Sequence, residues 1–177
     1  MTRAVSMMVV LCSVVMGVVL GGCKAGPGTY DLSVKLADSL KRPDGSLPPV
    51  QVDVIGIKAA DVAQWQGYSV SKYFSGDDAR RKDAAARGMK EMALGPSKPS
   101  DTLSRGDQLW GKWQKAEMIV ILANIPGYSG STGGDDARRL ILPTRTDFWK
   151  DARININVES SLLSIDSSTP KQTPKED

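Results

Sequence analysis

The feature that most constrains the fold is a strict alternation of apolar and polar residues in several short segments. In YDLSVKL, residues 30–36, every second residue is apolar, and residues 50–57 and 153–158 show the same period. A period of two places alternate side chains on opposite faces of a strand, one on a core and one in water. Three strands are therefore predicted. Gly56 favours a bulge in the second, which we expect to pair near the first.

Other segments add strands of a different kind. Residues 118–125 are apolar at nearly every position, which indicates a strand buried on both faces and central in its sheet. Residues 139–142 form a short apolar segment before a proline. Shorter strands are expected at residues 102–103 and 108–109. The chain is thus predicted to be mainly β.

The stretch between the second strand and residue 95 has another composition, because Ala, Met, Lys, Arg and Asp replace the β-branched residues. A helix is predicted over residues 77–92, with Ser75 as its N-cap and a helical turn before it at 61–66. The apolar positions of the helix over residues 77–92 would dock on a sheet. These positions are Ala85, Met89 and Met92. Strands on both sides of one helical insertion, between the second and third strands, favour an antiparallel two-sheet β-sandwich.

The N-terminus has the organisation of a bacterial export signal. Arg3 supplies a positive charge, and an uncharged apolar run of about 17 residues follows it. The sequence LGGC, ending at Cys23, resembles the lipobox of bacterial lipoproteins, in which the cysteine takes diacylglycerol on its sulfur before its new amine is acylated. A transmembrane anchor is the alternative, but the run has the minimum length for a span and lacks basic flanks. We expect residues 1–22 to be removed and Cys23 to be lipidated.

These signals predict the organisation of the whole chain. Residues 23–29 form a lipidated tether, residues 30–164 form one β-sandwich domain, and residues 165–177, rich in Ser, Thr, Pro and Lys, form a disordered tail. The mature chain is expected to have no disulfide, because Cys12 leaves with the signal and Cys23 carries lipid. Lys24 after the cysteine favours the periplasmic face of the outer membrane.

The composition excludes most catalytic chemistry. The chain has no histidine, so no histidine base, triad or metal site is expected, and no cofactor is implied. The formal net charge is +3, and the basic and acidic residues are interspersed along the chain. This pattern gives no indication of nucleic-acid binding. Two carboxylate pairs remain: Asp77 and Asp78 are interpreted as complementing a helix N-terminus, and Asp135 and Asp136 as solvating a glycine loop. A non-enzymatic protein is predicted.

One hexapeptide, GDDARR, occurs at residues 76–81 and again at 134–139. The flanking sequences differ, and one copy is expected to open a helix while the other leads into a strand. We therefore interpret the repeat as coincidence, because structural repeats require a longer similarity. The preceding GSTGG, residues 130–134, lacks the lysine of a phosphate-binding loop and is predicted to be a flexible connection.

Two hypotheses remain open for the four tryptophans, which are Trp65, Trp110, Trp113 and Trp149. They are numerous for a domain of this length and are consistent with a periplasmic module that binds a small ligand or glycan. More often such residues close the ends of a sandwich, with the ring buried and the N–H paired. The second interpretation is preferred.

The order of these parts resembles that of the outer-membrane lipoproteins of type VI secretion systems, the TssJ type. The first strand is followed by a loop rich in Pro, Gly and Asp at residues 38–49, then by PVQVDV at 49–54, which resembles that family's Pro-Val-x-Val-x-Val strand. IVILA at 119–123 resembles its apolar central strand, and Trp149 precedes the last strand as in the family. The family's Leu-Asn before the first loop and its Tyr-Gln-Leu after the second strand are missing here.

The resemblance implies a transthyretin-like sandwich that tethers a secretion complex by binding the periplasmic domain of a large inner-membrane protein. The first loop, residues 41–47, would lie in that contact. Its exposed composition agrees with a binding role, because loops carry function when a rigid scaffold presents them. The residues expected to contact the partner are Lys41, Arg42, Asp44 and Leu47.

Overall fold

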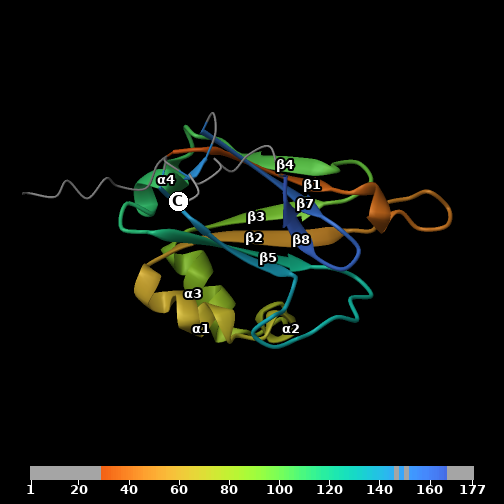
Figure 1. Cartoon of the computed structure of the whole chain (residues 1–177), viewed down its shortest axis with the longest axis horizontal. Helices are drawn as coiled ribbons and strands as arrows, with labels where there is room; N and C mark the ends of the chain where they lie inside the picture. The colour runs from red at the N-terminus through yellow and green to blue at the C-terminus, as the bar shows by residue number, and fades with distance from the viewer. Residues whose placement is uncertain (1–28, 146–147, 150–151, 167–177) are drawn as a thin grey trace, which may run out of the picture.

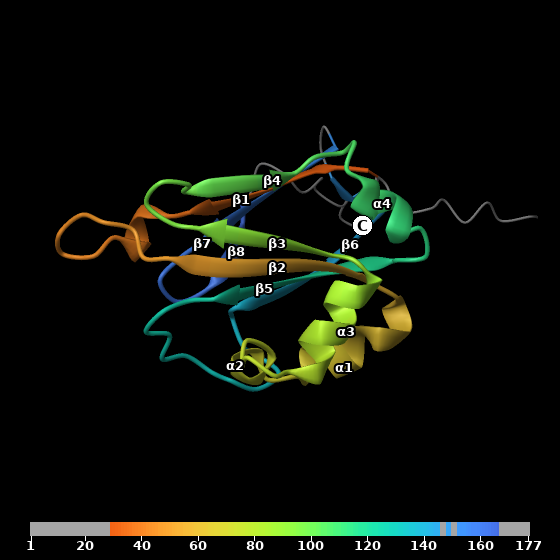
Figure 2. The same cartoon turned by 180° about the vertical axis from the view of Figure 1, so that it is seen from behind.

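The computed structural model describes residues 29–145, 148–149 and 152–166. Two four-stranded sheets pack face to face, and short helices cover the outer face of one of them (Figures 1 and 2). The predicted two-sheet β-sandwich is confirmed, and so is the helical insertion between the second and third strands. Residues 1–22, Cys23 and the end of the predicted tail, residues 167–177, lie outside the described part.

The first sheet has the strand order β4-β1-β7-β8. The strands are β1 (Asp31–Leu36), β4 (Ser100–Leu103), β7 (Arg153–Val158) and β8 (Leu163–Ile165). β1 pairs antiparallel with β4 but parallel with β7, so this sheet is not wholly antiparallel as expected. β8 includes Ile165, which pairs with Ile156. Ile165, predicted to begin the disordered tail, is therefore a strand residue, and the N–H of Asp166 after it donates to the Asn155 carbonyl.

The second sheet is antiparallel throughout and has the order β3-β2-β5-β6. Its strands are β2 (Val50–Ile57), β3 (Met89–Leu94), β5 (Met118–Asn124) and β6 (Arg139–Pro143). The predicted central position of β5 is confirmed. The expectation that the first two strands pair was wrong, because β1 and β2 lie in opposite sheets.

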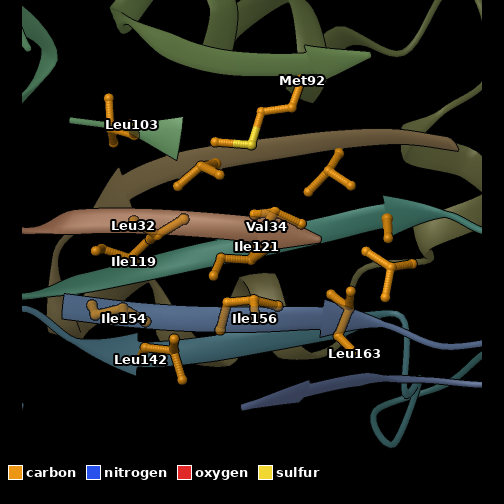
Figure 3. Packing of buried hydrophobic residues seen from close by; sticks show 14 of the residues in the cluster. Leu32, Val34, Met92, Leu103, Ile119, Ile121, Leu142, Ile154, Ile156 and Leu163 are labelled. Atoms are coloured by element: carbon orange, nitrogen blue, oxygen red, sulfur yellow. The ribbon is translucent and has the colours of Figure 1, made fainter. Parts of the chain in front are cut away.

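The main hydrophobic core lies between the two sheets (Figure 3). Leu32 and Val34 of β1 and Ile154 and Ile156 of β7 face Ile121 of β5 across it, and all five side chains are buried. The other faces of β2 and β5 are also apolar and pack against a layer of helices. This double burial explains why residues 118–123 are apolar without interruption.

The helical layer consists of η2 (Ala59–Asp61), α1 (Val62–Gln66), α2 (Val70–Tyr73) and α3 (Ala79–Arg87). Asp53 of β2, fully buried, faces this layer and accepts hydrogen bonds from the Arg81 Nε (2.8 Å) and the Tyr73 hydroxyl (3.1 Å). Burial raises the pKa of Asp53, and Arg81 opposes that rise. One buried carboxylate thus joins two helices to the sheet.

Two elements differ from their prediction. The helix expected over residues 77–92 ends at Gly88, whose φ of +102° disfavours other residues, and the chain continues as strand β3. Met89 and Met92 are therefore strand positions, because pairing with β2 outweighs helix propensity. The strand expected at 108–109 is instead the start of helix α4 (Gln108–Lys112), which Asp107 caps.

Gly56 is required by close packing and not by a bulge. The β2–β5 pairing is continuous through Gly56 and Ile119, so the expected bulge was wrong. A Cβ at position 56 would lie 2.5 Å from Cγ of Trp113. The indole therefore lies directly against the backbone of β2.

Gly56→Ala should lower the free energy of unfolding by about 1–3 kcal/mol, because the added methyl overlaps a buried ring that has no room to move. Urea unfolding followed by tryptophan fluorescence measures this loss. Gly111→Ala is the matched control, since a Cβ at position 111 in α4 meets no atom within 4 Å. Equal stability of the two variants would show that the Trp113 contact is not tight.

Candidate functional site

The loop predicted to bind a partner, residues 41–47, projects from one end of the sandwich. It follows β1 and the short helix η1 (Asp38–Leu40) and leads into β2 in the other sheet. In Figure 1 it extends to the right, in orange, whereas α4 lies at the left end (Figure 2 shows the same from behind). The loop thus lies at the end of the domain opposite to α4.

Hydrogen bonds within the loop hold it in one turn. The Arg42 N–H donates to the Ser46 carbonyl (2.9 Å), and the Gly45 N–H donates to the Arg42 carbonyl (2.8 Å). Asp44 Oδ1 accepts from both the N–H (2.9 Å) and the hydroxyl (2.6 Å) of Ser46. Gly45 has a φ of +80°, which this turn needs. The tip is therefore preorganised, and binding would cost little ordering entropy.

The four predicted contact residues differ in their exposure and in their contacts. Lys41 and Arg42 are exposed, and Lys41 forms a surface ion pair with Asp38 at 2.9 Å. Asp44 is exposed but is used by the turn, and its hydrogen bonds from Ser46 lower its pKa. Leu47 is half-buried and packs against the main core. The loop thus presents Lys41 and Arg42 together with the exposed carboxylates of Asp38 and Asp44, and the predicted apolar anchor packs inward.

The first copy of the repeated hexapeptide begins α3. Asp78 is the N-cap, and its Oδ1 accepts a hydrogen bond from the Arg81 N–H at 2.9 Å. The prediction that Asp77 and Asp78 complement a helix N-terminus is confirmed, with Asp78 in the place predicted for Ser75. Asp77 is exposed and pairs with a lysine. Neither carboxylate has the surroundings of a catalytic pair.

The second copy contradicts its interpretation as a solvated loop. Asp136 is buried and binds Arg138 through both oxygens, at 3.0 Å to Nε and 2.7 Å to Nη2. Arg138 is also buried, donates to the Ser71 hydroxyl (3.0 Å), and lies over the Tyr128 ring at 4.2 Å from its centroid. Only Asp135 of the pair is exposed. A buried, bidentate ion pair therefore fixes the glycine-rich connection to the helical layer.

Both copies of the hexapeptide contact Tyr68, which follows α1. Tyr68 donates a hydrogen bond from its hydroxyl to Asp78 (2.5 Å), and Arg80 lies over its ring at 4.3 Å. From the second copy, Arg139 donates to the Tyr68 carbonyl at 2.7 Å. The copies do lead into a helix and a strand, as expected from their flanks. Their side chains nevertheless take matching roles, with a buried aspartate followed by an arginine on a tyrosine ring.

All four tryptophans are buried, with 3–4% of their surface accessible. The indole N–H groups of Trp110, Trp113 and Trp149 each donate to a backbone carbonyl at 2.9 Å. Trp65 is covered by the guanidinium of Arg80, 5.1 Å from its ring centre. These rings therefore close the domain, as the preferred interpretation expected, and do not form a ligand platform. The described residues contain no group of metal-ligand side chains.

No protein-family model and no curated protein matches the chain. Solved structures do. The T6SS lipoprotein TssJ1 from Pseudomonas aeruginosa matches 84% of this chain and 99% of its own, with a TM-score of 0.51 and 13% identity. Serratia marcescens Lip, described as a membrane bound component of the Type VI Secretion System, matches 80% and 99% respectively, with a TM-score of 0.51 and 15% identity.

This chain has the fold of a TssJ lipoprotein. A chain in the structure described as the T6SS protein TssM C-terminal domain (869-1107) from EAEC also matches, over 77% of this chain and 99% of that chain, with a TM-score of 0.53 and 16% identity. The resemblance to the TssJ type is thus confirmed for the fold. Among the described residues of this TssJ-type domain, no helix is long and apolar enough to cross a membrane.

Proposed function

We propose that this protein is a non-catalytic lipoprotein that tethers a periplasm-spanning type VI secretion complex. Lipid on Cys23 holds it at the periplasmic face of the outer membrane, and loop 41–47 binds a protein partner. The observation that carries the proposal is the placement of a preorganised, charged loop at the end of a TssJ-type sandwich opposite to the first described residues.

The geometry of β1 supports this arrangement. Its six residues span about 20 Å and run from the end that holds Tyr30 and α4 to the end that carries the loop. The seven residues from Cys23 to Tyr30 reach at most about 25 Å. A lipid on Cys23 would therefore keep the α4 end near the bilayer and direct the loop into the periplasm.

The partner is inferred from the surface of the loop and from the structural neighbours. Lys41 and Arg42 offer exposed positive charge, which orients a partner and speeds its encounter. The neighbours are described as a T6SS lipoprotein, a membrane bound component of the Type VI Secretion System and the T6SS protein TssM C-terminal domain. We therefore propose the periplasmic domain of a TssM-type inner-membrane protein. Replacement of the loop, with co-purification of that protein as the readout, tests this half of the proposal.

The anchor is tested at Cys23. Cys23→Ser should carry no acyl group, because serine has no thiol to take diacylglycerol, and any attachment that remains should be that of the uncleaved apolar segment, residues 4–20. Cell fractionation and mass spectrometry of the N-terminus measure the change. Cys12→Ser is the matched control and should remain in the membrane, since Cys12 lies within the predicted signal. Acyl groups on Cys23→Ser, or an intact Met1 in the native protein, would contradict the anchor.

A further inference from the structure

One end of the sandwich is formed by the starts of β1, β5 and β7 together with α4. Tyr30, at the start of the domain, donates a hydrogen bond from its hydroxyl to the Thr144 carbonyl (2.6 Å), and its ring packs on Trp110 of α4 at 5.7 Å. Arg153 stands opposite Asp31 where β7 pairs with β1. The α4 end, as we name this surface, is thus the end at which β1 begins (Figure 1).

Among the residues that the structure describes at the α4 end, cations outnumber carboxylates; Asp147, Lys150 and Asp151 lie outside the described residues. The exposed basic residues here are Lys58, Arg105, Lys112, Lys115, Arg145 and Arg153. The carboxylates are Asp31, which pairs with Arg105 at 2.8 Å, Asp107, which caps α4, and Glu117, which accepts from the Ala59 N–H. Asp61, just beyond this end in η2, reduces the excess of positive charge without reversing it.

An aromatic side chain lies within this basic surface. Among the described residues, Phe148 is the one exposed large apolar side chain, with 44% of its surface accessible. The Arg145 guanidinium lies 5.9 Å from its ring centre, and the Phe148 N–H donates to the Arg145 carbonyl. An exposed aromatic ring with a guanidinium beside it, on a face that carries further exposed cations, is the composition of surfaces that rest on anionic bilayers.

We propose that the α4 end docks on the surface of anionic phospholipids. Phe148 enters the headgroup region, and Lys112, Lys115 and Arg153 lie against the phosphate groups. This inference rests on the proposed lipid at Cys23, which brings the same end to within about 25 Å of the bilayer. The lipid supplies attachment, whereas the basic surface supplies orientation, so the loop points away from the membrane and not along it.

The test uses the native lipidated protein reconstituted in vesicles. A fluorophore is attached to a single cysteine introduced at the exposed Gln108 of α4, and headgroup spin-labelled lipid serves as the quencher. Quenching should be strong in mixed phosphatidylglycerol and phosphatidylcholine vesicles. Quenching should be weaker in phosphatidylcholine alone. The ratio of docked to undocked protein should fall by about 5-fold for each lysine or arginine that no longer contacts an anionic lipid. A label at Pro43→Cys, at the loop end, is the positional control and should not be quenched.

Two surface variants separate docking from simple tethering. Lys112→Glu with Lys115→Glu, and separately Phe148→Ser, should each reduce quenching at position 108, with unchanged thermal unfolding because all three side chains are exposed. Quenching that is equal in both vesicle types and unaffected by these variants would overturn the inference while leaving the anchor and the tether intact. An unmodified Cys23 in the preparation would overturn both.

Discussion

Replacing residues 41–47 with glycine and serine should abolish co-purification of the TssM-type partner from membrane extracts, while Cys23 remains lipidated. The replacement removes the charges of Lys41 and Arg42 and also the turn that Asp44 and Ser46 hold. A flexible segment would have to lose conformational entropy on binding that the native loop has already lost. Pull-down from solubilised membranes followed by mass spectrometry measures the partner.

A sharper variant of the same experiment reverses the charges at two exposed positions. Lys41→Glu with Arg42→Glu leaves Leu47 in contact with the core, so the fold is unaffected, and association should slow by at least about 10-fold. The control replaces Ser131 and Thr132 with glycine in another exposed connection. If the partner is recovered at the native level from both loop variants, residues 41–47 are not the interface.

Asp136→Ala should destabilise the fold by about 3–5 kcal/mol, the loss expected when one member of a buried ion pair is removed and the other charge stays buried. Arg138 would lose three hydrogen bonds, two from its guanidinium and one from its backbone N–H, while its side chain stays only 6% accessible. Urea unfolding of the purified domain gives the free energy directly.

The neighbouring residue provides a matched control for that experiment. Asp135 is in the same turn but is exposed, so Asp135→Ala should change stability by no more than about 0.5 kcal/mol. The double variant Asp136→Ala with Arg138→Leu should recover part of the loss, because it removes the unpaired charge. A loss below 1 kcal/mol for Asp136→Ala, roughly the value of surface pairs, would show that water reaches this site.

The strands that could be predicted from the sequence are those in which the pattern of apolar residues matches the faces that the strand buries. Alternation in β1, β2 and β7, and the continuous apolar run of β5, follow from the faces that these strands bury. β3 was missed because MKEMAL consists mostly of good helix formers, and only its pairing with β2 makes it a strand. α4 was mistaken for a strand because an Asp cap followed by five residues leaves no helical period to detect.

The candidate site was predictable in position but not in detail. The Pro, Gly and Asp content of residues 38–49 correctly placed an exposed loop after the first strand. The direction of Leu47 depends on the packing of both sheets, which no local pattern encodes. The burial of Asp136 likewise depends on Tyr128 and Ser71, which are distant in sequence or in another layer. Its one local signal was the recurrence of Asp-x-Arg in the two hexapeptides.

The place of β1 within its sheet has a mechanical consequence. β1 lies between β4 and β7, and it alone connects the N-terminal end of the domain to η1 and the loop. A pull on the loop against an anchored N-terminus would run along the axis of this strand. The hydrogen bonds that join β1 to β4 and to β7 would then be loaded in shear, all at the same time. They would not be broken one after another from one end of the strand. A strand held on both sides in this way resists extension, which is a property that the proposed tethering role would require.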